Sequence, residues 1–233
     1  MAATPPSSDV VNALLLKQFP QLTLLRQTPQ IAMMHTVIRN KDSPREEFVF
    51  YADRLMRLLV EEGLCKLPIA SSTVMTPTEA RYDGVSPAGG ICGVSIMRAG
   101  ESMEAALRDT CRGVRIGKIL IQRNEDTAEP DARYNYSKMP KDIKDRWVLL
   151  LDPMLATGGS AARAVECLKG QYGVPENRII FLNVVACPEG IKYFCGRFPQ
   201  IQVVTSAIDD GLNEKKYILP GLGDFGDRYF GTV

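Results

Sequence analysis

The sequence predicts an α/β fold in which a mostly parallel central sheet is flanked by helices. From residue 91 onward, continuous apolar runs alternate with stretches of helical character. Strands of a parallel sheet are buried on both faces, so they lack the alternation of polar and apolar residues seen in half-exposed strands. One of the apolar runs ends in an aspartate and a Thr-Gly-Gly-Ser segment, which suits a tight connection from a buried strand to the next helix.

The N-terminal part is predicted to be helical. Residues 1–9 are rich in Pro, Ser and Thr and predict a flexible tail, which leaves residues 10–233 as a single domain. The clearest helix spans residues 44–62, where apolar side chains recur at spacings of three and four residues. Pro44 stands at its start and Gly63 follows its end, as is typical of helix boundaries.

The remaining elements follow from the apolar runs. Five strands are predicted, over residues 91–97, 115–122, 147–151, 179–186 and 201–208. Helices are predicted over residues 101–111 and 160–170. The long polar stretch 123–145 is predicted to be either a lid over a binding site or a solvated surface excursion, and both interpretations stay open.

Composition and charge exclude several functional classes. The 28 basic and 27 acidic residues give a net charge of +1, without the basic surplus of a nucleic-acid-binding protein. No apolar run reaches the ~20 residues of a membrane helix, and no signal-peptide pattern is visible. The six cysteines form no Cys-x-x-Cys pair, and the single histidine, His35, completes no zinc-binding spacing. We expect a reduced, cytoplasmic protein with no membrane partner and no metal site made by protein side chains alone.

The segment VLLLDPMLATGGSA, residues 148–161, predicts a phosphate-binding loop. Gly158 and Gly159 permit a tight turn, and the following helix start directs several backbone N–H groups to one point. Thr157 and Ser160 add hydroxyl donors, while the lysine of a nucleoside-triphosphate P-loop is missing. The loop therefore suits a terminal monophosphate.

Asp152 predicts a sugar next to that phosphate. In open α/β sheets, ligands bind outside the carboxyl ends of strands, where Asp152 stands. A carboxylate repels phosphate but accepts hydrogen bonds from ribose hydroxyls, so a phosphorylated sugar is the indicated ligand. The alternative is an ordinary strand–turn–helix connection with a capping side chain.

The C-terminal segment YILPGLGDFGDRYFGT, residues 217–232, predicts a loop that approaches a flat ligand. Gly221, Gly223 and Gly226 match the dinucleotide fingerprint G-x-G-x-x-G, but the seven residues after Gly226 leave no room for the helix and strand it requires. Glycines instead expose backbone N–H and C=O groups that can read the edge of a base. By composition alone, a glycine-rich tail without a role is the alternative.

Arg98 is a candidate for a diphosphate group, because a guanidinium binds phosphate oxygens in a bidentate manner, and an ordinary surface arginine is the alternative. Arg98 ends the strand predicted over 91–97, at the same sheet edge as Asp152. Arg123 opens the polar stretch, in the segment Arg-Asn-Glu-Asp-Thr.

Taken together, these motifs resemble the type I phosphoribosyltransferases. An apolar strand, Asp152 and Ala-Thr-Gly-Gly-Ser are similar to the family's motif for phosphoribosyl diphosphate (PRPP), and Pro153 in place of a second acid is similar to the uracil branch. Ile-x-Pro-Gly-x-Gly-Asp-x-Gly-Asp-Arg, residues 218–228, resembles the uracil-binding signature of that branch. Arg-Ala-Gly at Arg98 and Tyr-x-Lys-x-Pro over 136–140 resemble its diphosphate loop and lid, whereas Asn124 departs from the family's acid.

The resemblance implies a type I phosphoribosyltransferase fold with N-terminal helices and a C-terminal base-binding loop or hood. The implied catalytic residues are Asp152, Arg98 and Asp224. The implied PRPP-binding residues are Arg98, Arg123, Asp152, Pro153, Met154, Leu155, Ala156, Thr157, Gly158, Gly159, Ser160 and Asp224. The implied uracil-binding residues are Ile218, Gly223, Asp224 and Phe225. The resemblance implies that backbone groups of Ile218, Gly223 and Phe225 face the base.

The implied reaction is pyrimidine salvage, in which uracil and PRPP give UMP and diphosphate, with Mg²⁺ arriving on PRPP. A non-catalytic nucleotide sensor on the same fold is the alternative. A third interpretation is an enzyme for purines or for orotate, whose carboxylate would call for a cation such as Lys215 or Lys216.

The family resemblance also extends to regulation. Some family members are oligomers activated by GTP, which implies a homo-oligomer, either a dimer or a tetramer, with Arg45 and Arg54 as GTP phosphate contacts. Ala88, Gly89 and Gly90 stand where larger polar side chains would be expected in that site. His35 lies on a predicted helix, and we expect it to be packed or exposed rather than catalytic.

Overall fold

The central sheet has eight strands. The computed structural model describes residues 8–123 and 130–232. The strand order is β1-β10-β9-β7-β4-β5-β6, with β8 paired to β9, and every pairing is parallel except the antiparallel β5–β6 pair. The strands are β1 Leu22–Leu24, β4 Ile91–Met97, β5 Arg115–Arg123, β6 Pro130–Lys138, β7 Trp147–Leu151, β8 Met154–Leu155, β9 Ile179–Ala186 and β10 Gln202–Ile208. The predicted α/β class and the five predicted strands are confirmed.

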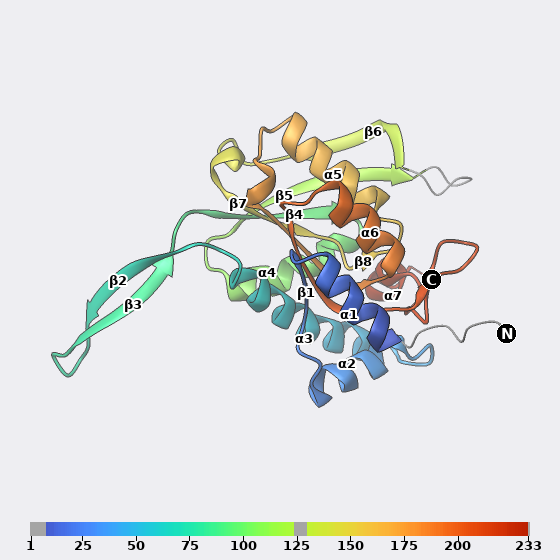
Figure 1. Ribbon diagram of the computed structural model, residues 1–233, viewed down its shortest axis with the longest axis horizontal. Helices are drawn as coiled ribbons and strands as arrows, with labels where there is room; N and C mark the ends of the chain where they lie inside the picture. The colour runs from blue at the N-terminus through green and yellow to red at the C-terminus, as the bar shows by residue number, and fades with distance from the viewer. Residues whose placement is uncertain (1–7, 124–129, 233) are drawn as a thin grey trace.

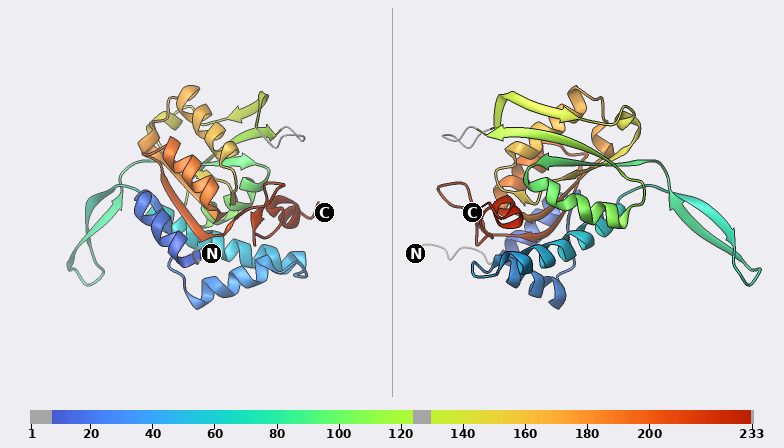
Figure 2. Two further views of the ribbon diagram at one scale, coloured as in Figure 1. Left: turned by 45° about the vertical axis from the view of Figure 1, so that its right-hand side comes forward. Right: turned by 180° about the vertical axis from the view of Figure 1, so that it is seen from behind.

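Helices cover both faces of this sheet (Figures 1 and 2). The α-helices are α1 Ser8–Gln18, α2 Pro29–Arg39, α3 Arg45–Leu64, α4 Glu104–Thr110, α5 Gly159–Gly170, α6 Pro188–Arg197 and α7 Phe225–Phe230. Alternate residues of β7 pack on opposite faces: Val148 and Leu150 join a core with α1, α5 and α6, whereas Leu149 and Leu151 join one with α2, α3 and α4. Burial on both faces explains why the strands read as unbroken apolar runs.

Three helix boundaries refine the predictions. The predicted helix 44–62 is α3, Arg45–Leu64, and the predicted helix 160–170 is α5, Gly159–Gly170. The predicted helix 101–111 is split into a short 3-10 helix, Ala99–Met103, and α4. Helix α1 begins at Ser8, so the described chain becomes regular inside the predicted tail 1–9, whose first seven residues lie outside the described part.

The stretch 123–145 is only partly the irregular connection that was predicted. Its middle part, Pro130–Lys138, forms β6, which pairs with β5 in an antiparallel manner, with Lys138 opposite Lys118, and makes the edge of the sheet. A 3-10 turn, Ile143–Asp145, then leads into β7. Residues 124–129, including Asn124, lie outside the described residues, so the choice between a lid and a surface excursion stays open.

A two-stranded arm was not predicted from the sequence. Strands β2 Ile69–Met75 and β3 Arg81–Pro87 pair only with each other and project far from the rest of the molecule (Figures 1 and 2). Most of their side chains are exposed, including Ile69, Met75 and Val85. Their mixed composition lacks the long apolar run on which the other strands were recognised.

Candidate functional site

A cavity of about 370 Å³ opens at the carboxyl ends of the parallel strands. Three segments that are distant in the sequence line it. They are residues 96–99 at the end of β4, residues of the 152–160 segment after β7, and residues of the C-terminal segment 215–226. The three motifs that sequence analysis singled out therefore meet in one place.

The segment after β7 is fixed to the sheet before it reaches the cavity. Asp152 is buried, with 7% of its surface exposed, and its backbone N–H donates to the Leu182 carbonyl of β9 at 3.3 Å. The Pro153 carbonyl accepts from the N–H groups of Val184 and Val185, at 2.9 and 3.0 Å. The two residues of β8 then pair with β9. The aspartate is thereby held at the cavity wall by a continuous backbone ladder.

The loop that follows turns sharply into α5. Gly158 has a φ of +81° and precedes the first helical residue, Gly159. The Thr157 hydroxyl accepts from the Gly159 N–H at 3.4 Å. Helix α6 packs close behind, since a Cβ on Gly190 would lie 2.3 Å from the Ala156 carbonyl oxygen. Glycines on both sides allow this close approach of backbones.

The structure divides the predicted PRPP-binding residues of this segment into two groups. Asp152, Met154, Ala156, Thr157 and Ser160 line the cavity. The other four predicted residues, Pro153, Leu155, Gly158 and Gly159, are not among the lining residues. Leu155 is a core residue and the Pro153 carbonyl accepts hydrogen bonds from β9, and their predicted contact with PRPP stays a prediction.

Arg98 lies at the cavity, directly after β4, and is tied to the C-terminal helix. Its Nη1 donates to the Thr232 hydroxyl at 2.8 Å, and its Nη2 forms an ion pair with Asp227. The hydrogen bond from Thr232 and the adjacent Arg98 guanidinium lower the pKa of Asp227. About half of the Arg98 side chain is exposed, so its guanidinium is accessible from the cavity.

Arg123 is the last residue of β5, and its backbone is paired with Pro130 of β6. Its side chain lies outside the described part of the chain, as does all of Asn124. The predicted contact of Arg123 with diphosphate therefore stays a prediction.

The C-terminal segment forms a small hood over the cavity. Strands β11 Gly211–Leu212 and β12 Ile218–Leu219 pair in an antiparallel manner, and Lys215, Lys216 and Tyr217 from their connection line the cavity. The loop after β12 then leads to α7, where the Asp224 carboxylate caps the helix by accepting from the Asp227 N–H at 2.9 Å. The predicted hood is present, and it carries both lysines that could serve an orotate carboxylate.

The predicted uracil-binding residues all lie in the cavity wall: Ile218, Gly223, Asp224 and Phe225. The Ile218 and Phe225 side chains are packed in the core, with Phe225 in edge contact with Phe48 at 5.2 Å between ring centroids. Gly223 has a φ of +83°, which a side chain would disfavour. Because the side chains of Ile218 and Phe225 pack in the core, these residues present backbone groups at the cavity wall.

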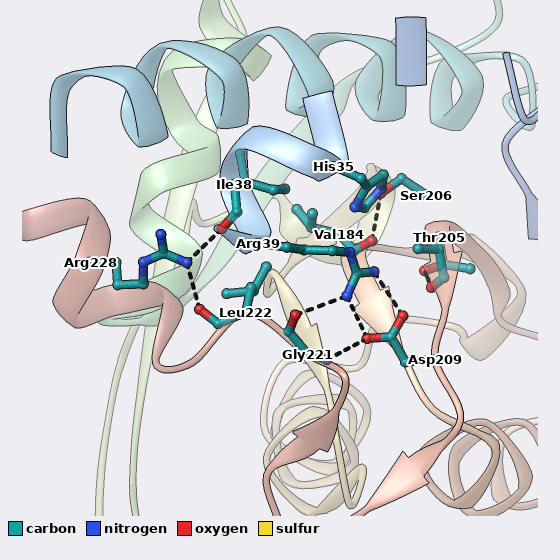
Figure 3. Close-up of polar contacts among 11 residues, drawn as sticks. His35, Ile38, Arg39, Val184, Thr205, Ser206, Asp209, Gly221, Leu222 and Arg228 are labelled. Atoms are coloured by element: carbon teal, nitrogen blue, oxygen red, sulfur yellow. Dashed lines mark hydrogen bonds and ion pairs between the residues drawn. The ribbon is translucent and has the colours of Figure 1, made fainter. Parts of the chain in front are cut away.

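Sequence reasoning missed the residues that hold this hood in place (Figure 3). Arg39, at the end of α2, forms a two-pronged ion pair with Asp209, with both N–O distances at 2.7 Å, and donates to the Gly221 carbonyl at 2.9 Å. Arg228 of α7 donates to the carbonyls of Ile38 and Leu222, at 2.5 and 2.7 Å. These partners are up to 190 residues apart. Arg228 belongs to the 218–228 signature, but no local sequence pattern indicates its contacts with α2 or the role of Arg39 and Asp209.

His35 and Cys92 are buried and serve the packing of the protein. The His35 Nε2 lies 3.0 Å from the Ser206 hydroxyl, which itself donates to the Val184 carbonyl (Figure 3), so Nε2 carries the proton that His35 donates. Burial, assisted by the Arg39 charge, lowers the His35 pKa to about 4, although Asp209 opposes this. Burial likewise raises the pKa of the Cys92 thiol to about 11, so this thiol is a poor nucleophile. As expected, His35 is a packed helical histidine.

Neither a metal cage nor a membrane-spanning helix is found in the described part of the chain. Within residues 8–123 and 130–232, no group of three or more His, Cys, Asp or Glu side chains gathers as a metal cage. Among the helices that the structure describes, none is long and apolar enough to cross a membrane.

The parallel sheet, the loop between β7 and α5, and the hood over the cavity are features of the type I phosphoribosyltransferase fold. A family model, uracil phosphoribosyltransferase, matches residues 25–232. The uracil phosphoribosyltransferase of Dictyostelium discoideum is 56% identical over 211 residues, covering 91% of this chain and 96% of that protein. The uracil phosphoribosyltransferase 1 of Schizosaccharomyces pombe is 59% identical over 209 residues, covering 90% and 94%.

A solved structure gives the same answer for the fold. A protein from Aquifex aeolicus superposes with a TM-score of 0.79 at 29% identity, covering 91% of this chain and 99% of that one. This chain belongs to the uracil phosphoribosyltransferase family.

Proposed function

We propose that this chain is a pyrimidine salvage enzyme that transfers the 5-phosphoribosyl group of PRPP to uracil, giving UMP and diphosphate. The observation that carries the proposal is that one cavity is lined by all three motifs: Arg98, Asp152, Ala156, Thr157, Ser160, Ile218 and residues 223–226. Membership of the uracil phosphoribosyltransferase family supports the same reaction. Each of the three sequence motifs then has a part of the two substrates to bind.

In this proposal the phosphate of PRPP binds at the start of α5. Thr157 and Ser160 offer hydroxyls there, and the backbone N–H groups at the helix start face the same region. Asp152, on the same wall, accepts hydrogen bonds from the ribose hydroxyls. Arg98 binds the diphosphate, which then competes with Asp227 for the guanidinium. The two anchors hold the sugar with its C1′ toward the hood.

Uracil binds under the hood. Backbone groups of Ile218, Gly223 and Phe225 pair with its O2, N3–H and O4, and Asp224 lies at the junction between base and PRPP. Cytosine has an unprotonated N3 and an amino group, so the same backbone pattern would leave buried polar groups mispaired. Recognition of this kind selects uracil without a dedicated side chain.

The reaction replaces one bond at C1′ with another. The C1′–O bond to diphosphate breaks, the N1–C1′ bond forms, and uracil loses its N1 proton. Positive charge develops on the ribose ring as the bond to diphosphate loosens, and the leaving diphosphate gains negative charge. The protein contributes by positioning the reactants and by placing Arg98 against the leaving group.

Mg²⁺ is proposed to arrive with PRPP. Asp152 and Asp224 line the same cavity and supply carboxylate oxygens, the ligand type that Mg²⁺ prefers, and no larger acidic cage gathers within the described residues. This donor set fits an ion held mainly by substrate phosphates and water. When bound, the ion neutralises charge on the diphosphate.

Three further expectations stay proposals. The exposed apolar side chains of the arm, such as Ile69 and Val85, support a homo-oligomer in which the arm is buried against a second copy; the mass in solution tests this proposal.

For GTP activation, Arg45 and Arg54 lie on α3, where Arg45 donates to the Tyr229 carbonyl at 2.8 Å and Arg54 to Gln30 at 3.3 Å. A GTP titration that changes neither activity nor mass would overturn it. The six free cysteines support a cytoplasmic location, which cell fractionation tests.

The direct test of function is to incubate the purified chain with uracil, PRPP and Mg²⁺ and to measure UMP and diphosphate. Cytosine, orotate and hypoxanthine are run in parallel. UMP from uracil alone is the expected result. Product from orotate would instead assign Lys215 and Lys216 to its carboxylate, and PRPP binding without product from any base would favour the sensor.

A further inference from the structure

The ion pair between Arg39 and Asp209 supports the hood, and neither residue lines the substrate cavity. Arg39, the basic member of the pair with Asp209, lines a second cavity of about 430 Å³ together with Pro220 to Gly223. The substrate cavity is lined by other residues of the C-terminal segment, and the two cavities share only Gly223. Pro220, Gly221 and Leu222 thus line the cavity of the charged pair and not the substrate cavity.

The pair forms a closed ring with the loop. Arg39 donates to both Asp209 oxygens and to the Gly221 carbonyl, and the Gly221 N–H donates back to the Asp209 carboxylate at 2.9 Å (Figure 3). The backbone C=O of Gly221 thus accepts from Arg39, and its N–H donates to Asp209. Ion pairs with two parallel hydrogen bonds constrain geometry as well as adding binding energy.

The ring is itself anchored to rigid elements. Asp209 follows β10 directly, and its backbone N–H donates to the Ala186 carbonyl at the end of β9, at 2.8 Å. Its side chain is only 5% exposed, and that of Arg39 is 21% exposed. Arg39 is the last residue of α2. The ring therefore fixes Gly221 relative to both the sheet and a helix.

Gly221 lies next to the backbone groups that are proposed to contact the base. Its φ is +60°, and a Cβ placed on it would lie 2.1 Å from the Ile218 carbonyl oxygen. Because the Gly221 backbone packs this closely against the Ile218 carbonyl, we expect a displacement of Gly221 to shift Ile218, and Gly223 is only two residues further on. These are two of the three backbone positions assigned to uracil.

We propose that Arg39 and Asp209 are positioning residues that set the affinity and the selectivity for uracil by fixing the backbone of the hood. The inference rests on the proposed function and deepens it. Reading a base with backbone groups demands fixed donor and acceptor positions, because no side chain can adjust to compensate. Loss of the charge on Asp209 loosens the loop while the phosphate loop, held by the β7–β9 ladder, keeps its place.

The test compares steady-state kinetics of Asp209→Asn and Arg39→Lys with those of the wild-type chain. Asn keeps the shape and one acceptor, and Lys keeps the charge without the two-pronged geometry. We expect the KM for uracil to rise about 10-fold or more and the KM for PRPP to change by less than about 2-fold, since charged hydrogen bonds carry this weight. The preference for uracil over cytosine is expected to fall in parallel.

The matched control is Asp109→Asn, which removes the charge from an exposed ion pair with Arg57 that lines neither cavity. Its kinetics are expected to be unchanged. A second readout is backbone amide exchange, in which the peptide containing Gly221 should exchange faster in Asp209→Asn than in the wild-type chain.

Equal increases in both KM values, or unchanged kinetics together with unchanged exchange, would overturn the inference. Faster exchange with unchanged selectivity would overturn it too, because a purely structural role predicts that outcome. If the wild-type chain makes no UMP, the proposed function fails instead. The two failures are therefore distinguishable in one set of assays.

Discussion

The segment 152–160, proposed to bind phosphate and called the phosphate loop, lines the same cavity as the hood, but the two are held in different ways. The phosphate loop continues directly from β7, and backbone hydrogen bonds to β9 reach as far as β8. The hood has only the two-residue strands β11 and β12, and charged side chains from α2, α7 and the end of β10 fix it. Under the proposed function, the sheet positions the loop for the sugar phosphate, whereas a few arginine contacts position the loop for the base.

The largest effect is expected at the better-anchored loop. Asp152→Asn removes the carboxylate proposed to hold ribose while the backbone ladder around it stays intact. We expect UMP formation to fall about 100-fold or more, because misplacement of the reacting group has costs of this size. Initial rates with saturating uracil measure it.

The control for Asp152 is Asp145→Asn at an exposed position before β7. It should leave the rate unchanged. An Asp152→Asn protein with near wild-type activity would remove ribose binding from the role of this residue.

The next effect concerns how the hood is attached. Arg228→Lys loses the fork that reaches the carbonyls of Ile38, Leu222 and Asn40. Lysine has one charged nitrogen on a flexible stem, so buried carbonyls lose partners and the free energy of unfolding should fall by about 2 kcal/mol. Urea unfolding measures it. Arg57→Lys, at an exposed ion pair, should change it by less than about 0.5 kcal/mol.

Two glycine variants sharpen the contrast between the loops. A Cβ at Gly190 would meet the Ala156 carbonyl at 2.3 Å, and one at Gly221 would meet the Ile218 carbonyl at 2.1 Å. Gly190→Ala should therefore raise mainly the KM for PRPP, and Gly221→Ala mainly the KM for uracil, each by about 10-fold as the pushed backbone misplaces its ligand.

Gly170→Ala is the control for both variants, because nothing lies within 4 Å of a Cβ at that position. Its two KM values should equal those of the wild-type chain. If both glycine variants shifted the same KM, the division of the cavity into two separately held loops would be wrong.

The smallest effect is a pH dependence from α2, the helix that supports the hood. The pKa of His35 is about 4 in the folded chain, below its ordinary value of 6.5, because burial disfavours the charged ring. The unfolded chain thus binds more protons between these values, so stability is full above about pH 6.5 and falls as the pH drops. Between pH 7 and 5.5 we expect a loss of about 1 kcal/mol from this group.

Urea unfolding at both pH values measures this loss. In His35→Gln, which retains a donor for the Ser206 hydroxyl, this part of the pH dependence should disappear. An identical slope in the variant would assign the pH dependence to other groups.

The sequence was sufficient to predict those parts of the fold that depend on local pattern. The apolar runs at β4, β7, β9 and β10 identify buried strands, and Asp152 could be placed at their carboxyl ends. The arm of β2 and β3 was missed because exposed strands that pair only with each other carry no apolar run. Among the predicted PRPP residues, the Pro153 carbonyl accepts hydrogen bonds from β9 and Leu155 packs in the core, which the motif alone did not indicate; their contact with PRPP stays a prediction.

The supports of the hood could not be predicted for a different reason. Arg39 and Asp209 are 170 residues apart, and each alone resembles any charged surface residue. They form an ion pair only when the fold brings α2 and the end of β10 together. The uracil signature, by contrast, is contiguous, so the family resemblance alone led to the prediction that Ile218 and Gly223 contact uracil. The structure places both residues in the cavity wall, and the contact with uracil stays a prediction.

A crystal structure of the chain with bound UMP is the most direct test of the division between the two loops. We expect the phosphate of UMP within hydrogen-bond distance of the Thr157 hydroxyl and of N–H groups at the start of α5. We expect the uracil edge to face backbone groups of Ile218 and Gly223. A phosphate bound elsewhere, or a base contacted only by side chains, would contradict the account.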